Sequence, residues 1–284
     1  MIIVLGATGH IGSQVIKLLS QKDDQVIGIT HDEKNRFQIE SSGAEAAVAD
    51  VNDVEQLTKV FERGDVLYFL NPPGDISKDP SAEEKDFVAK IIEAIKKSGI
   101  KKVVAESTYG AQSGEKLGNL GVLYEMEKAL EKLDTDMTII RGAYYFTNWE
   151  MSLESAKTEG KIYSMYPPDF KLPMVDPKDI AEFATQKLTS NTNEKLNFIE
   201  GPQQYSPNDV AAAFSIALRK PVEAVEIKRE GWQDFLTNAG FSAVAAESMI
   251  NMTQLTLDAE FESENANRGT TNLEEYVAAL LNER

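Results

Sequence analysis

The first 145 residues alternate between short apolar runs and longer segments that mix apolar and polar positions. A short, uninterrupted apolar run between polar segments is typical of a strand buried on both faces of a parallel sheet. By this criterion strands are predicted at residues 2–5, 26–30, 46–49, 66–70, 102–105 and 137–140.

Helices are predicted between these strands. The apolar stripe of the first helix comprises Ile11, Val15, Leu18 and Leu19. Asn52 and Glu55 have the spacing of a capping box and predict a helix start, as do Ser81 and Glu84. Another helix is expected over 119–133. Alternating strands and helices predict an α/β fold with a doubly wound parallel sheet.

The pattern changes beyond about Asn148, where helices are long relative to the strands. Strands are expected at 161–164, 196–199 and 222–227, and helices at 177–188, 206–218, 229–239, 243–262 and 272–282. We therefore expect a first domain over 1–150 and a smaller C-terminal α/β substrate domain over 151–284. The segment 172–190 is expected to return and pack on the first domain.

Composition excludes several classes of function. The chain has 284 residues, a net charge of −17, no cysteine, and only His10 and His31 as histidines. The negative charge argues against nucleic acid or an anionic membrane as a partner. Disulfides, thiolate metal sites and cysteine nucleophiles are excluded, and no metal site is expected. The N-terminus has no signal-peptide pattern, so a cytoplasmic setting is expected.

The strongest motif is the glycine loop GATGHIG, which follows the first strand and opens a helix. Gly6 would allow the tight turn, Gly9 the close approach of a pyrophosphate, and Gly12 the packing of helix against strand. Free N–H groups at the helix start would face the phosphates. The predicted cofactor-binding residues of this loop are Gly6, Thr8, Gly9, His10, Ile11 and Gly12. This context predicts a Rossmann-type dinucleotide-binding domain.

The segment after the second strand would select between NADP and NAD. Asp32 has the spacing of the acidic residue that binds the ribose of NAD. His31, Lys34 or Arg36 could instead hold the 2′-phosphate of NADP, and of these His31 and Arg36 are the predicted cofactor-binding residues. We expect a slight preference for NADP, with NAD remaining possible. Asp50 would meet the adenine, although a capping role would explain it equally well.

Several stretches of the chain, taken in order, resemble the NmrA-like, atypical short-chain dehydrogenase/reductase family. They are GATGHIG at 6–12, ADV at 49–51, LNPPG at 70–74, EST at 106–108, YEMEKALEKL at 124–133, TIIRGAYYFTNW at 138–149, LPMVDPKDIA at 172–181 and GPQQYSPNDVA at 201–211. The resemblance implies a nicotinamide cofactor at the sheet edge and a small C-terminal substrate domain. The family includes quinone and dye reductases, and also members that only sense the cofactor. Val51 would border the adenine, and Asn71 would approach the ribose and nicotinamide.

A catalytic triad can be written from Ser107, Tyr124 and Lys128. Tyr124 and Lys128 lie four residues apart on one helix, so the lysine could lower the pKa of the tyrosine. The resembled family instead implies the register of Leu123 and Glu127, in which Leu123 cannot transfer a proton. A half-exposed tyrosine beside a solvated lysine explains the same spacing.

An aromatic cluster at the end of the sixth strand offers a second candidate site. Flat rings suit a flat acceptor at the carboxyl edge of a doubly wound sheet, although interdomain packing would also explain them. The predicted substrate-binding residues are Tyr109, Tyr145, Phe146 and Asn148.

These observations predict an NAD(P)H-dependent oxidoreductase that transfers hydride to a small quinone-like or aromatic acceptor. One alternative is a non-catalytic redox sensor that binds NAD(P) and a protein partner. Another is a sugar-nucleotide epimerase or dehydratase, which would require Tyr124 and Lys128 as a working pair. A small-molecule substrate is expected, and a homodimer or a protein partner stays open.

Overall fold

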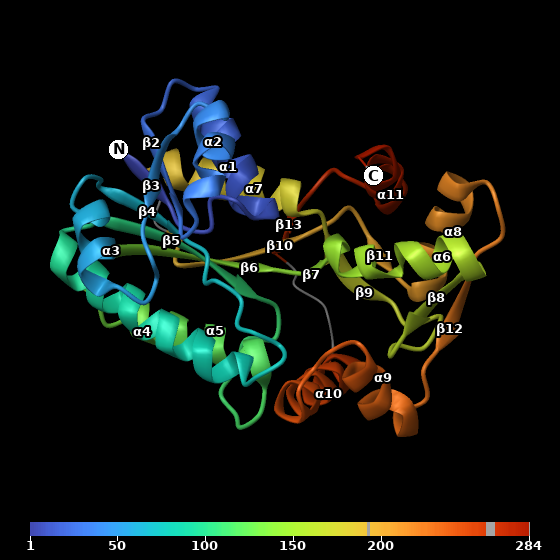
Figure 1. Ribbon diagram of the computed structural model, residues 1–284. Helices are drawn as coiled ribbons and strands as arrows, with labels where there is room; N and C mark the ends of the chain where they lie inside the picture. The colour runs from blue at the N-terminus through green and yellow to red at the C-terminus, as the bar shows by residue number, and fades with distance from the viewer. Residues whose placement is uncertain (192–193, 260–264, 284) are drawn as a thin grey trace.

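The computed structural model describes residues 1–191, 194–259 and 265–283 and is built around one large parallel sheet (Figure 1). The sheet has eight strands in the order β13-β10-β6-β5-β4-β1-β2-β3, and all its pairings are parallel. Its strands are β1 (Ile2–Val4), β2 (Val26–Thr30), β3 (Glu45–Val48), β4 (Val66–Phe69), β5 (Lys102–Thr108), β6 (Asp136–Gly142), β10 (Leu196–Glu200) and β13 (Asn267–Arg268). The predicted α/β fold with a doubly wound parallel sheet is confirmed.

Helices cover both faces of this sheet, and each face has its own apolar core. One face carries α1 (His10–Ser20), α2 (Arg36–Ser41) and α7 (Pro177–Thr189). The other carries α3 (Val54–Phe61), α4 (Pro80–Ser98) and α5 (Gly118–Leu130). Strand residues of opposite parity supply the two cores: Val103 and Ala105 of β5 face α5, and Val104 faces the α1 side. The helices change face between β1 and β4, which is the point where such sheets bind ligands.

Two predicted helix starts are wrong by one or two residues. Asp53, not Asn52, caps α3, because its carboxylate accepts a hydrogen bond from the N–H of Gln56. Asp79, not Ser81, caps α4. Pro80 then occupies the first turn of α4, where its missing N–H costs nothing.

The rest of the chain builds a smaller part around a third apolar cluster, which includes Phe146, Trp149, Tyr205 and Phe214. Its strands are β7 (Tyr144–Tyr145), β8 (Lys161–Ser164), β9 (Leu172–Val175), β11 (Gln204–Tyr205) and β12 (Glu223–Glu226). Its helices are α6 (Leu153–Glu159), α8 (Pro207–Leu218), α9 (Trp232–Asn238), α10 (Ala243–Leu257) and α11 (Leu273–Glu283), with short 3-10 turns at Phe146–Ser152 (η2) and Arg229–Gly231 (η3). A further 3-10 turn, η1 (Glu33–Asn35), joins β2 to α2 beside the large sheet. The helix predicted over 243–262 ends at Leu257, and its predicted residues 260–262 lie outside the described part.

The chain returns to the large sheet after residue 150. α7 packs against α1, as expected for the segment 172–190. The strand expected at 196–199 in the smaller part is β10, and it pairs with β6 in the large sheet. That expectation is wrong, because placing a strand in a sheet requires knowledge of its neighbours. The two parts are thus interleaved along the chain.

No helix in the described ranges is both long enough and apolar enough to span a membrane.

Candidate functional site

The glycine loop lies at the carboxyl end of β1, at the start of α1. Gly6 has a φ of +76°, a conformation that favours glycine, and its carbonyl accepts a hydrogen bond from the N–H of Gly9 at 3.1 Å. A Cβ on Gly12 would lie 2.2 Å from the Gly6 oxygen, so α1 can pack this close only with glycine there. A Cβ on Gly9 would meet nothing closer than 3.5 Å, so the chain leaves open space at this residue.

The start of α1 is suited to an anion. Gly9 is its N-cap, and no side chain in the described part of the protein caps it. The first N–H groups of a helix and its dipole then favour a phosphate at this position. His10 is exposed and Thr8 is half-buried, whereas the Ile11 side chain is 3% exposed and packs in the core. Ile11 could therefore meet a cofactor only through its backbone.

The turn after β2 holds the residues predicted to select the cofactor. His31 is exposed. Asp32 caps η1, because its carboxylate accepts a hydrogen bond from the N–H of Lys34 at 3.0 Å. Arg36 donates from Nε to Glu33 at 2.7 Å and makes a longer contact with Glu40.

Asp50 and Val51 follow β3 at the same edge of the sheet. The Asp50 carboxylate accepts hydrogen bonds from the backbone and side-chain amides of Asn52, at 2.8 and 3.1 Å. Val51 is half-buried against the α3–α5 core.

Asn71 follows β4 and lies against a buried carboxylate. Its side-chain amide donates to the carbonyl of Glu84 at 3.3 Å, while its Oδ1 is buried and has no hydrogen-bond partner among the described residues. The Glu84 carboxylate, whose residue is 7% exposed, accepts from the N–H of Gly74 and from Asn119. Burial raises the pKa of Glu84. Glu84 thus ties the loop after β4 to the start of α5, and Asn71 retains an acceptor for a hydroxyl or amide.

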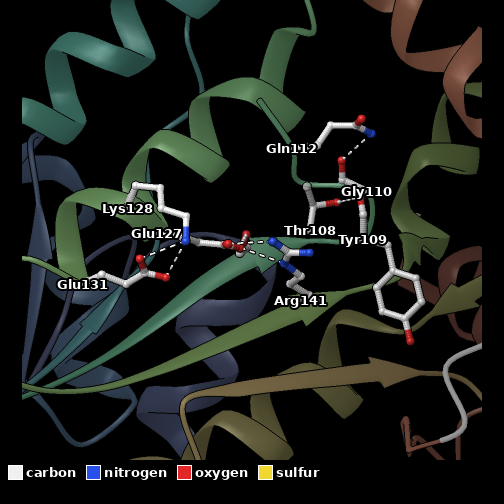
Figure 2. A network of polar contacts seen from close by, with 9 residues as sticks. Thr108, Tyr109, Gly110, Gln112, Glu127, Lys128, Glu131 and Arg141 are labelled. Carbon is white, nitrogen blue, oxygen red and sulfur yellow. Dashed lines mark hydrogen bonds and ion pairs between the residues drawn. The ribbon is translucent and has the colours of Figure 1, made fainter. Parts of the chain in front are cut away.

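Ser107 and Lys128 are hydrogen-bonded to different carboxylates, and Figure 2 shows Lys128 with Glu131. Ser107 is fully buried and donates to Glu127 at 2.5 Å. Lys128 donates to both carboxylate oxygens of Glu131, and its ammonium lies 5.5 Å from the centre of the Tyr124 ring. The hydrogen bond to Glu131 is the main reason that the pKa of Lys128 is raised.

Glu127 is the centre of this network. Arg141 of β6 binds both its carboxylate oxygens, at 2.9 and 2.7 Å. The Arg141 guanidinium also lies 5.9 Å from the centre of the Phe198 ring. Leu123, the other residue of the register implied by the family resemblance, is buried in the core with Met126.

A groove of about 420 Å³ opens beside this network, between α5, β6 and the start of β10. It is lined by Tyr124, Glu127, Lys128, Glu131, Met137, Ile139, Arg141, Lys195 and Leu196. The groove includes Met137 near the start of β6 and Leu196 at the start of β10, so it extends towards the N-terminal ends of these strands. The glycine loop lies at the opposite, carboxyl edge of the sheet.

The four predicted substrate residues lie in different environments. The Tyr109 ring packs edge-on against Phe198, and its hydroxyl oxygen is buried with no hydrogen-bond partner in the described part of the chain. Tyr145 is half-buried and donates to Glu106 at 3.3 Å. Phe146 is fully buried in the core of the smaller part, and Asn148 is exposed.

Four charged residues of this region were not predicted as site residues: Glu84, Glu106, Glu127 and Arg141. Glu106 is 2% exposed and accepts hydrogen bonds from Tyr68 and Tyr145, each at 3.3 Å. Burial raises its pKa to about 8. The sequence feature that could have identified Glu106 and Arg141 is a charged residue inside an apolar strand, in KVVAEST and MTIIRG respectively.

A metal centre requires a group of side chains that can bind the ion. Among the residues that the structure describes, no group of three or more His, Cys, Asp or Glu side chains is arranged to hold an ion.

Comparisons with known proteins agree with this geometry. The model of the NmrA-like family matches residues 1–277. The NAD(P)H azoreductase of Xenophilus azovorans is 26% identical over 250 residues, covering 88% of this chain and 85% of that protein.

Two solved structures have the same fold. The triphenylmethane reductase of Citrobacter sp., complexed with NADP(H), has a TM-score of 0.84 at 23% identity and covers 99% of this chain and 100% of its own. The NADPH-dependent quinone oxidoreductase of Escherichia coli, complexed with NADPH, has a TM-score of 0.81 at 22% identity with the same coverage.

Proposed function

The chain belongs to the NmrA-like family, and on that premise we propose that it is an NAD(P)H-dependent reductase that transfers hydride to a small quinone-like or aromatic acceptor. Its relatives support this proposal, since they are named as reductases of azo compounds, quinones and triphenylmethane dyes. We propose NADP as the preferred cofactor, with NAD as the second. The non-catalytic sensor is not favoured.

The observation that carries the proposal is the open start of α1 at the point where the helices change face. The loop fits a pyrophosphate for two reasons: a Cβ would fill the space at Gly9, and no side chain among the described residues caps the first turn of α1. The unpartnered Oδ1 of Asn71 supplies an acceptor at the neighbouring strand end. These groups would hold the phosphates and a ribose hydroxyl or amide of a bound dinucleotide.

The bound nicotinamide would supply the hydride, so the protein's task is to bind, orient and exclude water. Glu84 fixes the loop that carries Asn71. Tyr109 and Tyr145 lie at the carboxyl ends of β5 and β6, where we propose that the flat acceptor binds. Phe146 is fully buried in the core of the smaller part and directly follows Tyr145, so it would position Tyr145 rather than contact the acceptor.

We propose that the proton of the reaction comes from water rather than from Tyr124. Lys128 is engaged by Glu131, and Ser107 is engaged by Glu127. A lysine whose charge is neutralised by a carboxylate is less able to stabilise a tyrosinate. The source of the proton, water rather than the predicted triad of Ser107, Tyr124 and Lys128, is therefore the part of the proposal that most needs a test.

The test follows oxidation of NADPH and NADH by absorbance against a panel of quinones, azo dyes, triphenylmethane dyes and aldehydes. Tyr124→Phe is measured beside the wild-type protein, and we expect at least about half of the wild-type kcat in the variant. Tyr163→Phe is the matched control, because Tyr163 lies on β8 and its hydroxyl donates to Glu159.

Each other outcome has a defined meaning. Loss of turnover in Tyr124→Phe alone would assign the acid to Tyr124 and restore the triad. Cofactor binding without turnover on any acceptor would contradict the reductase and favour the sensor. Absence of binding to either nucleotide would contradict the proposal as a whole.

A further inference from the structure

The turn between β2 and α2 leads into Arg36, a cation that already pairs with two carboxylates. β2 pairs with β1 in register, Gly28 beside Val4, so the turn after Thr30 lies at the same edge of the sheet as the glycine loop. A dinucleotide whose pyrophosphate lies on α1 would place its adenosine ribose over this turn. The residues of the turn therefore face the position that distinguishes NADP from NAD.

Asp32 is already used to shape this turn. Its carboxylate accepts the N–H of Lys34, and the N–H of Asp32 itself bonds to the Thr30 hydroxyl at 3.2 Å. The Asn35 amide also donates to the Thr30 hydroxyl. These contacts fix the path of the chain from β2 into α2, and so they fix the position of Arg36.

The Arg36 guanidinium lies between two acidic side chains. Glu33, three residues before it, accepts from Nε at 2.7 Å, and Glu40, four residues after it, lies 3.5 Å from a terminal nitrogen. The pairing with Glu33, and less strongly with Glu40, raises the pKa of Arg36. The side chains of Arg36, Glu33 and Glu40 are 42%, 69% and 47% exposed, so a ligand can reach Arg36 and displace these carboxylates at a modest cost in free energy.

We propose that Glu33 is a specificity-determining residue, which competes with the 2′-phosphate of NADPH for Arg36 and thereby narrows the preference for NADPH over NADH. This inference rests on the proposed function, because it concerns the choice of cofactor. The 2′-phosphate must replace Glu33 at the guanidinium and then lies near a carboxylate that repels it. NADH has a 2′-hydroxyl instead, so it need not displace Glu33 and is not repelled by its carboxylate.

The test is a binding measurement on the whole chain that needs no turnover. Dissociation constants for NADPH and NADH are measured by nucleotide fluorescence, and those for adenosine 2′,5′-bisphosphate and 5′-AMP by calorimetry. We expect Glu33→Gln to bind NADPH and the bisphosphate about two- to fivefold more tightly, the range expected for freeing one exposed charge pair. NADH and 5′-AMP should change by less than about twofold.

A matched variant controls for the change in net charge. Glu93→Gln removes an exposed carboxylate that pairs with Lys97 on α4, which covers the opposite face of the sheet from α2, and should leave all four constants unchanged. In the Glu33→Gln/Arg36→Gln double variant most of the gain in affinity for NADPH should disappear, because Glu33 acts through the Arg36 guanidinium.

Three results would overturn the inference: no tightening for NADPH in Glu33→Gln, equal tightening in Glu93→Gln, or a full gain in the double variant. If the wild-type protein binds neither nucleotide, the proposed function fails, and this inference fails with it. Binding of both nucleotides with no effect of Glu33 rejects this inference alone.

Discussion

At the residue scale, two ion pairs differ mainly in exposure: one joins α5 to β6, and the other lies at the C-terminal end of α5. Glu127 and Arg141 are 7% and 17% exposed, whereas Glu131 and Lys128 are 45% and 44% exposed. Removing one partner from a buried pair leaves an uncompensated charge, which usually costs about 3–5 kcal/mol. An exposed pair contributes about 0–1 kcal/mol.

We therefore expect Glu127→Gln to lower the free energy of unfolding by about 3 kcal/mol, and Glu131→Gln to lower it by less than about 1 kcal/mol. The two variants are a matched pair, because the same change is made in the last turn of α5 and at its C-cap. Urea unfolding followed by circular dichroism measures both. Equal values for the two variants would show that the Glu127 network contributes no more than a surface pair.

At the scale of the element, α1 separates two roles of glycine. Gly12 fits between helix and strand, where a Cβ would lie 2.2 Å from a backbone oxygen. Gly9 borders open space and has a φ of −80°, which alanine adopts without strain. One glycine is therefore required by packing and the other by the proposed ligand.

Alanine at each position should separate these roles. We expect Gly12→Ala to lower the free energy of unfolding by at least about 2 kcal/mol. Gly9→Ala should leave stability nearly unchanged and weaken NADPH binding at least about tenfold, because its Cβ would occupy the space of the pyrophosphate. Urea unfolding and NADPH fluorescence titration measure the two effects, and a Gly9→Ala protein with wild-type affinity would argue against the proposed phosphate site.

At the scale of the whole molecule, Glu106 joins the two parts of the fold. It lies on β5, and its carboxylate accepts hydrogen bonds from Tyr68 of the large sheet and from Tyr145 of β7, a strand of a smaller sheet. Burial raises its pKa from an ordinary value of 4.5 to about 8, although the two hydroxyls oppose that shift. The folded protein therefore holds a proton that the unfolded chain releases at lower pH.

This difference predicts how stability depends on pH. Below pH 4.5 the carboxyl is protonated in both states, and its contribution is fully present. Between pH 4.5 and about 8 only the unfolded chain is ionised, so stability falls by up to about 1.4 kcal/mol per pH unit. Above that range the contribution is lost.

Glu106→Gln should remove this dependence, because glutamine does not titrate. We expect the free energy of unfolding of the variant, minus that of the wild type, to rise from pH 5 to pH 8 and then to level off. Urea unfolding at a series of pH values measures the difference, with Glu93→Gln as an exposed control that should show little change. A flat difference across the range would mean that Glu106 is not a buried titrating group.

The sequence by itself determined the class of fold and the place of the glycine loop. Apolar runs and amphipathic stripes are local patterns, and burial of a strand on both faces leaves few alternatives to a parallel sheet. The loop could be predicted because Gly6 and Gly12 satisfy local demands, a turn and a close approach within a few residues of each other.

Only the tertiary structure decided what lies opposite each polar side chain. Ser107 meets Glu127 across 20 residues, Tyr145 meets Glu106 across 39, and the strand at 196–200 joins the large sheet beside β6. Each of these contacts depends on sheet order and on which face a strand residue occupies. That information is shared between distant segments, so no local pattern contains it.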